Sequence, residues 1–252
     1  MTKQEALFEY VLRAGDDSLI LGQRLSEWCG HGPILEEDIA MTNIALDLIG
    51  QATSLLAYAG EVEGKGRDED KIAFLRYEKE YRNLLLVEQP NVDFGVTMAR
   101  QFLFDIYHFY FFKGLLNSSD TQLAAIAEKS LKEVTYHVKH SSEWIIRLGD
   151  GTEESHERIQ QAINDLWSYT GEMFEMDQVD EIMIAEGVGI DLTKIKAHWH
   201  DHVEQVLNRA TLKMPEYGYM HLGGRRGRHT EYMGYILTEM QYMQRAYPNM
   251  EW

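Results

Sequence analysis

The sequence predicts an all-α protein: a four-helix bundle followed by additional C-terminal helices. Apolar residues recur at the three- and four-residue spacing of helices rather than in the alternation typical of strands. Only four prolines, at positions 33, 90, 215 and 248, interrupt this pattern. The four longest helical segments are joined by short or moderate connections, as in helical bundles. We expect one domain over residues 1–252, because a chain of this length can bury one sizeable core.

The first two helices are separated by a Gly-His-Gly-Pro break at residues 30–33. Leu21 and Leu25 lie on one face of the first helix, which the glycines and the proline then terminate. The second helix starts with acidic residues at positions 36–38, which suit the positive end of a helix dipole. One face of this second helix is marked by Ile39, Asn43, Leu46 and Gly50.

The remaining helices follow from glycine, proline and capping signals. A shorter helix is predicted over 68–86, before the Val-Glu-Gln-Pro-Asn turn. The segment 94–116 is rich in aromatic residues and apolar nearly all round, so it belongs in the centre of a bundle or against a partner. A long helix over 120–148 comes next. Further helices are predicted over 153–173, 193–210 and 229–247.

Charge and composition exclude several classes of partner. The formal net charge of -17 argues against a nucleic-acid-binding protein, since phosphate backbones attract clustered lysines and arginines. No run approaches the roughly 20 apolar residues of a membrane span, and the N-terminal residues lack the apolar core of a secretion signal. Cys29, the single cysteine, forms no internal disulfide, which fits a reducing compartment. We expect a cytoplasmic protein.

Acidic residues and histidines stand inside the apolar helices at spacings that metal sites use. Asp105 and His108 are three residues apart, and Glu133 and His137 are four apart, so each pair shares a helix face. Helical bundles build di-iron sites from such inward carboxylates and imidazoles. The alternative is that these buried groups satisfy one another without a metal. The candidate ligands are Glu27, Asp47, Asp105, His108, Glu133 and His137.

Several segments make the chain recognisable as a member of a known family. They are Gln23-Arg24-Leu25-Ser26-Glu27-Trp28-Cys29-Gly30-His31, Leu84-Leu85-Leu86-Val87-Glu88-Gln89-Pro90-Asn91, Glu239-Met240-Gln241-Tyr242 and the terminal Trp252. Over essentially its whole length, the chain resembles the structural C subunits of bacterial phenylacetyl-CoA 1,2-epoxidases. The resemblance implies a ferritin-like four-helix bundle that is related in ancestry to the catalytic A subunit.

The same resemblance implies a function at the level of a complex. The chain is expected to be non-catalytic, to hold no cofactor, and to support the A subunit and other epoxidase subunits in aerobic phenylacetate degradation. The A subunit holds two irons and inserts one oxygen atom of O2 into the aromatic ring of phenylacetyl-CoA. Its electrons come from NADPH through a reductase with FAD and an iron-sulfur cluster. Without these partners, we expect the chain to form a homodimer.

The ligand order of the catalytic A subunit implies that the metal site of this chain is degenerate. Glu27 and Asp105 match a Glu on the first helix and an Asp on the third, and His137 matches the His on the fourth. Three of the six ligands are replaced. Asp47 and Glu133 stand one residue from the lost carboxylates, but one residue rotates a side chain by about 100°. The six positions of the expected remnant are Glu27, Leu48, Gln51, Asp105, Val134 and His137.

Two further segments carry charged or metal-binding side chains. Arg225, Arg226 and Arg228 lie between glycines just before a predicted helix, where guanidinium groups and a helix N-terminus both favour phosphate. They are predicted to contact either the CoA phosphates or an acidic surface at a subunit interface. His198 and His202 have metal spacing, but a solvated helix face is expected there. The rival function is a self-sufficient di-iron oxidase or an iron-binding ferritin-like protein.

Overall fold

The computed structural model describes residues 1–216, 218–248 and 250. Within these ranges the chain forms nine α-helices and no strand, which confirms the all-α prediction and agrees with a ferritin-like helical bundle. Trp252, part of the family resemblance, lies outside the described residues. The helices are α1 (Lys3–Ser26), α2 (Leu35–Glu63), α3 (Glu69–Phe74), α4 (Phe94–Leu115), α5 (Thr121–Gly149), α6 (Glu153–Trp167), α7 (Gln178–Ala185), α8 (Leu192–Arg209) and α9 (Glu231–Ala246).

The chain folds into two compact units, each built from segments far apart in the sequence. Unit 1 comprises Met1–Gln89, Gln178–Met183 and Gly223–Trp252. Unit 2 comprises Pro90–Asp177 and Ile184–Leu222. The single ferritin-like domain expected over the whole chain stays a prediction.

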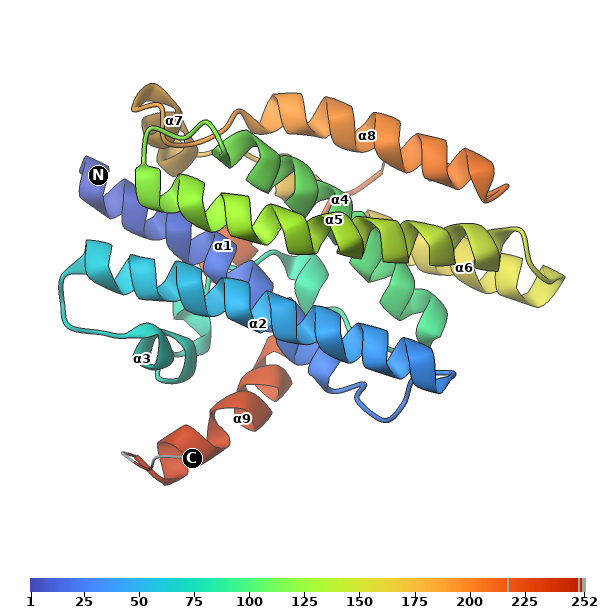
Figure 1. Cartoon of the computed structure of the whole chain (residues 1–252), viewed down its shortest axis with the longest axis horizontal. Helices are drawn as coiled ribbons and strands as arrows, with labels where there is room; N and C mark the ends of the chain where they lie inside the picture. Colours follow the sequence, from blue (N-terminus) through green and yellow to red (C-terminus); the bar gives the residue numbers. More distant parts are fainter. Residues whose placement is uncertain (217, 249, 251–252) are drawn as a thin grey trace. The chain divides into compact units, whose positions relative to one another are not determined.

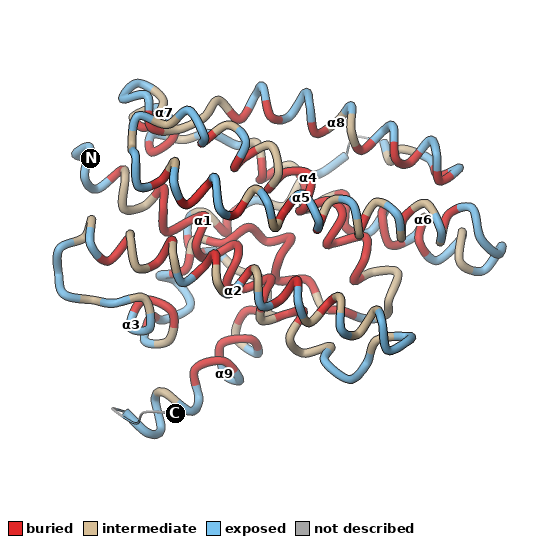
Figure 2. The backbone as a smooth tube through the Cα atoms, viewed as in Figure 1, coloured by how far each residue is buried: buried red, intermediate tan, exposed pale blue. Residues whose placement is uncertain are grey.

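Helices α1 and α2 form the principal pair of unit 1 and lie side by side (Figure 1). Glycines of α1 permit their close approach: a Cβ atom at Gly15 would lie 2.6 Å from Leu56 Cδ2, and one at Gly22 would lie 3.3 Å from Leu48 Cβ. The middle of α1 is buried all round (Figure 2). The two helices therefore form a hairpin whose packing leaves no room for side chains at these glycines.

The helix predicted over 68–86 is wrong for most of its length. It ends at Phe74, and only two short 3-10 turns follow, Glu78–Glu80 and Leu85–Glu88. Side chains of α1 compete with the helix for its backbone. The amide of Arg82 donates to Asp16 Oδ2 at 2.8 Å, and the amide of Leu84 donates to Asp17 Oδ1 at 2.7 Å. Because these backbone donors are satisfied by carboxylates, the segment has no need of helical hydrogen bonds.

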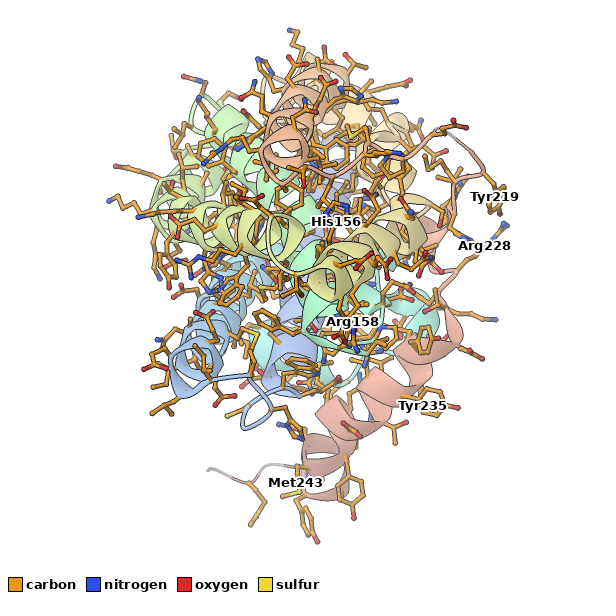
Figure 3. All side chains as sticks on the ribbon, turned by 90° about the vertical axis from the view of Figure 1, so that its right-hand side faces the viewer. His156, Arg158, Tyr219, Arg228, Tyr235 and Met243 are labelled. Atoms are coloured by element: carbon orange, nitrogen blue, oxygen red, sulfur yellow. The ribbon has the colours of Figure 1, made fainter. Side chains whose placement is uncertain are left out.

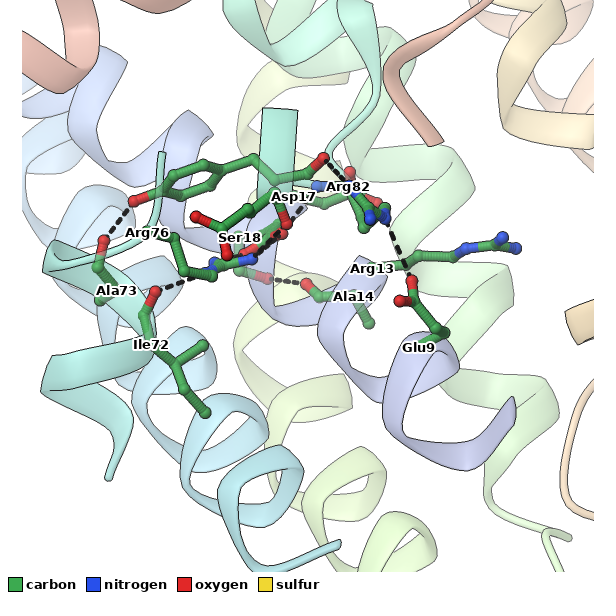
Figure 4. Close-up of polar contacts among 12 residues, drawn as sticks. Glu9, Arg13, Ala14, Asp17, Ser18, Ile72, Ala73, Arg76 and Arg82 are labelled. Atoms are coloured by element: carbon green, nitrogen blue, oxygen red, sulfur yellow. Dashed lines mark hydrogen bonds and ion pairs between the residues drawn. The ribbon is translucent and has the colours of Figure 1, made fainter. Parts of the chain in front are cut away.

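Asp16 and Asp17 are the acidic pair of α1, and both are buried. Asp16 forms a two-pronged ion pair with Arg76 (Figure 4). Asp17 binds both terminal nitrogens of Arg225, at 2.8 and 3.1 Å. Burial raises the pKa of Asp17 to about 6, although the Arg225 charge opposes this shift. Because the ordinary value is 3.8, ionisation of Asp17 costs folding free energy as the pH rises from about 4 to about 6.

Glu88 fastens the start of α9 to the rest of unit 1. Its carboxylate is buried, and it accepts a hydrogen bond from His229 Nδ1 at 2.6 Å. The amide and hydroxyl of Thr230 donate to its second oxygen at 2.8 and 2.6 Å. His229 Nε2 lies 3.2 Å from the Tyr81 carbonyl, so both ring nitrogens face acceptors. Burial opposes a charge on His229, but the hydrogen bond to Glu88 and its negative charge raise the pKa of the ring.

Unit 2 is built around α4, which confirms the prediction of a central, all-round apolar helix. Nearly every residue of α4 is buried, and α5, α6 and α8 all pack against it (Figure 2). Trp199 of α8 donates its indole N–H to the Leu103 carbonyl at 2.9 Å. The predicted ends of the helices over 94–116, 120–148 and 193–210 are correct to within a residue.

Two predictions about the segment between α6 and α8 need correction. The helix predicted over 153–173 ends at Trp167, and a 3-10 turn, Gly171–Phe174, follows it. The hydroxyl of Thr170 donates to the Trp167 carbonyl at 2.8 Å, so a local side-chain bond caps the end of α6. The eight-residue helix α7 was not predicted, because it is too short for a clear apolar period.

Replacing Arg225 with methionine tests the ion pair with Asp17. The variant leaves a buried carboxylate without its counter-charge, so we expect it to lower the free energy of unfolding by about 3 kcal/mol at pH 7.5. The loss is expected to shrink at pH 5, where Asp17 is mostly protonated because its pKa is about 6. Urea denaturation at both pH values measures the difference.

Arg226→Met is the matched control for this experiment, because Arg226 is the adjacent arginine and its side chain is exposed. It is expected to leave stability unchanged at both pH values. Equal losses in the two variants, or a loss in Arg225→Met that is independent of pH, would contradict the ion pair.

Candidate functional site

The six positions of the expected metal-site remnant are divided between the two units. Unit 1 holds the three that come first in the chain, and unit 2 holds the other three. Each set has its own surroundings, which are described separately below. The first set is Glu27, Leu48 and Gln51, and the second is Asp105, Val134 and His137.

In unit 1, apolar packing takes the place of a carboxylate on α2. Leu48 is fully buried and lies against α1 at Gly22. Gln51, one turn further along, is also buried. Asp47 is only partly buried, because its side chain points about 100° away from that of Leu48. The buried stripe of α2 therefore carries the leucine and not the neighbouring aspartate.

Glu27 keeps its carboxylate but gives it to an arginine. It caps the C-terminus of α1 and forms an ion pair with Arg24, whose Nη1 lies 2.9 Å from Glu27 Oε2. The remaining nitrogens of Arg24 donate to the Glu88 carbonyl at 3.0 and 2.8 Å. Glu27 also lines a cavity of about 360 Å³ together with Tyr235 of α9, whose side chain is labelled in Figure 3. The charge of Glu27 is thus compensated within unit 1.

In unit 2, Asp105 is held by neutral donors. Gln101 Nε2 donates to its Oδ1 at 2.6 Å, and the hydroxyl of Ser141 donates to its Oδ2 at 2.8 Å. The carboxyl group has no exposed surface. Burial raises the pKa of Asp105 to about 6, although His137 and the two hydrogen bonds oppose this shift. Asp105 is therefore a buried polar group satisfied by its own unit.

The buried stripe of α5 runs through Val134, His137 and Ser141. Their spacing of three and four residues places them on one helix face. Val134 and His137 have no exposed surface, whereas Glu133 is partly exposed. A carboxylate at position 133 therefore lies off the stripe that Val134 occupies.

His108 is buried among aromatic rings. Its ring centroid lies 4.7 Å from that of Phe104 and 4.4 Å from that of Phe112. Neither ring nitrogen has a hydrogen-bond partner among the described residues. Burial, followed by the nearby charge of His137, lowers the pKa of His108 to about 3, so its ring is neutral at pH 7. His108 acts here as an aromatic core residue.

These surroundings do not fit a di-iron centre. A pair of irons in a helical bundle needs several carboxylates to bridge the metals and balance their charge. Leu48 and Val134 offer no lone pair at the two positions where carboxylates are expected. Within the part of the chain that the structure describes, no three His, Cys, Asp or Glu side chains are grouped to hold a metal ion.

The arginine segment before α9 divides into one largely buried and two exposed side chains. Arg225 donates to Asp17 and to the carbonyls of Arg13 and Arg82, so it anchors unit 1 internally. This differs from the surface contact predicted for it. Arg226 and Arg228 are exposed, and Arg228 is labelled in Figure 3. Their contact with CoA phosphates or an acidic surface stays a prediction.

The face of α2 that the sequence singled out is exposed and apolar. Leu35 is 70% exposed, Leu46 61% and Ile39 52%. A Cβ atom at Gly50 would meet nothing within 4 Å. By length and mean hydropathy of 1.3, α2 is the one described helix that passes the test for a membrane span, but 44% of that window is buried in the protein. A helix packed on one side and apolar on the other passes the same test.

The resemblance inferred from the sequence is confirmed by comparison with known proteins. The sequence matches the family described as phenylacetic acid catabolic protein over residues 1–252. It is similar to the C subunit of the 1,2-phenylacetyl-CoA epoxidase of Escherichia coli (strain K12). The two are 48% identical over 246 residues, which cover 98% of this chain and 99% of that protein. The chain therefore belongs to the family of phenylacetic acid catabolic proteins.

Proposed function

We propose that the chain is the non-catalytic structural subunit of a phenylacetyl-CoA epoxidase complex. The family, and the relative named as the C subunit of an epoxidase, support a role in such a complex. The observation that carries the non-catalytic role is the burial of Leu48 and Val134 on the stripes where a di-iron site needs carboxylates. The irons then belong to the catalytic subunit, and NADPH, FAD and an iron-sulfur cluster belong to the reductase. The complex works in the cytoplasm.

The exposed apolar face of α2 is the proposed docking surface for the catalytic subunit. It consists of Leu35, Ile39, Leu46 and Ile49, which repeat at helical spacing. Contiguous exposed apolar surface of this kind marks protein interfaces. A relative named as one subunit of an enzyme has partner subunits to bind, which decides the occupant. In the absence of the catalytic subunit, a second copy of this chain covers the same face as a homodimer.

Charge reversal on α2 tests the docking surface. The double variant Ile39→Glu and Leu46→Glu places two charges in the centre of the face, so we expect its affinity for the catalytic subunit to fall at least about 100-fold. Both side chains are more than half exposed, so the thermal midpoint of the variant should stay that of the wild type. Size-exclusion chromatography of the co-expressed subunits measures the complex.

Val92→Glu is the control, because Val92 is 75% exposed and lies outside α2. This variant is expected to elute together with the catalytic subunit like the wild type. Joint elution of the α2 double variant would count against the docking surface. Separate elution of the wild-type pair at micromolar concentration would count against the structural role itself.

Iron analysis distinguishes the proposal from a self-sufficient di-iron oxidase or an iron-binding protein. Protein produced in iron-rich medium is expected to hold less than about a tenth of an iron per chain, since the donor set lacks the carboxylates that balance two irons. It is also expected to give no oxidation of phenylacetyl-CoA without the catalytic subunit. Near-stoichiometric iron together with O2-dependent turnover would overturn the proposal.

Asp105→Asn tests whether the buried carboxyl is a polar remnant. The asparagine still accepts from Gln101 and donates to Ser141, but it cannot ionise. The pKa of Asp105 is about 6, above the ordinary 3.8, so the stability of its protonated form is lost as the pH rises from about 4 to about 6. We expect the variant to lack this loss and to gain about 2 kcal/mol relative to the wild type between pH 4 and pH 7.5.

Urea denaturation across this pH range gives the free energies of unfolding. Asp165→Asn, at an exposed acid of α6, serves as the control and should follow the wild type at each pH. A metal ligand behaves in the opposite way, because its removal costs stability at neutral pH. Destabilisation of Asp105→Asn at pH 7.5 would contradict the assignment.

A further inference from the structure

A cavity of about 450 Å³ opens in unit 2 where the end of α4 meets the beginning of α8. This volume lies within the range of small-molecule sites in proteins. The two helices are packed against each other, and the loop before α8 closes one side of the cavity. Its principal lining residues are Tyr110, Lys113, Ile190, Lys194, Ile195 and His198.

One wall of the cavity is apolar and closely packed. Ile190 lies against Gly114 of α4, where a Cβ atom would approach Ile190 Cγ2 to 2.8 Å. Ile195, on the first turn of α8, is buried beside it. A glycine at position 114 thus lets the loop pack directly onto α4. The result is a surface suited to an apolar body of a ligand.

A second wall is aromatic. The rings of Tyr110 and His198 are stacked, with centroids 5.4 Å apart and an angle of 24° between their planes. His198 Nδ1 donates to the Lys194 carbonyl at 2.8 Å, which fixes the orientation of the imidazole. The hydroxyl of Tyr110 lies 3.4 Å from His202 Nδ1 on the next turn of α8. The stacked pair therefore presents ring surface to a planar ligand.

The cavity carries positive charge in a chain whose formal net charge is -17. Lys113 and Lys194 line it from opposite helices, and Asp191 is the only acidic residue among the described residues that line it. The Oδ1 atom of Asp191 accepts from the amide and hydroxyl of Thr193 at 3.0 and 2.6 Å, so it caps α8. Two ammonium groups face one carboxylate, which leaves a net charge of one, matching a ligand with a single negative charge.

We propose that this cavity binds a small aromatic monocarboxylate. The ring of the ligand packs on Tyr110, His198 and the isoleucine wall, and its carboxylate lies between Lys113 and Lys194. Since the lysines are exposed, screening by solvent limits the strength of these ion pairs. The dissociation constant is expected at about 0.1 to 1 mM. The site is independent of the α2 docking surface and of the proposed function.

Three matched probes test the chemistry on the full chain by isothermal titration calorimetry. Phenylacetate carries both the ring and the charge, 2-phenylethanol lacks the charge, and cyclohexylacetate lacks the aromatic ring. We expect saturable binding of phenylacetate, and binding of each analogue at least about fivefold weaker. Absence of saturation by phenylacetate up to about 10 mM, or equal affinity for phenylacetate and either analogue, would overturn the proposal.

Substitutions locate the binding. Lys113→Gln combined with Lys194→Gln is expected to weaken phenylacetate at least about tenfold. Lys196→Gln changes an exposed lysine of α8 that does not line the cavity, and it should leave the affinity unchanged. All three lysines are exposed, so the circular dichroism spectrum and the thermal midpoint should not move. Unchanged affinity in the double variant, or an equal loss in Lys196→Gln, would contradict this site.

Discussion

The acidic pair Asp16 and Asp17 on α1 is the interaction on which unit 1 depends. Two adjacent carboxylates inside a core are costly unless each is matched by charge and hydrogen bonds. Here each one receives an arginine and a backbone amide, from Arg76 and Arg82 and from Arg225 and Leu84. The connection after α2 and the segment before α9 are thereby drawn onto α1. Their paths are set by polar groups that must be satisfied, and apolar burial follows.

The helices that the sequence predicted well are those whose structure depends on apolar periodicity. The burial of α4 on all sides was readable from its aromatic residues, and the ends of α5 from its aspartate cap and its glycines. The segment 68–86 was mispredicted because its propensity is helical while its backbone donors are taken by α1. A competitor about 60 residues away, such as Asp16 for Arg76, leaves no local signal.

Much the same holds for the candidate site. Position by position, the sequence placed Leu48 and Val134 where carboxylates are needed, and the rotation of neighbouring residues around a helix explains why Asp47 and Glu133 lie off the buried stripes. What could not be read was the company each polar group keeps. His108 has the spacing of a ligand, yet it packs between phenylalanine rings. Arg225 looked like a surface arginine, and its acceptor lies near the other end of the chain.

The ion pair between Arg225 and Asp17 also governs the order in which the protein can be completed during synthesis. Its partners are separated by 208 positions, so α1 leaves the ribosome long before the arginine that neutralises it. All of unit 2, residues 90–177 and 184–222, is made in the meantime. Unit 2 therefore has every one of its residues available first, while unit 1 holds an unmatched buried acid until the chain is almost finished. A ribosome stalled just before residue 225 would carry one finished unit and one waiting for its last charge.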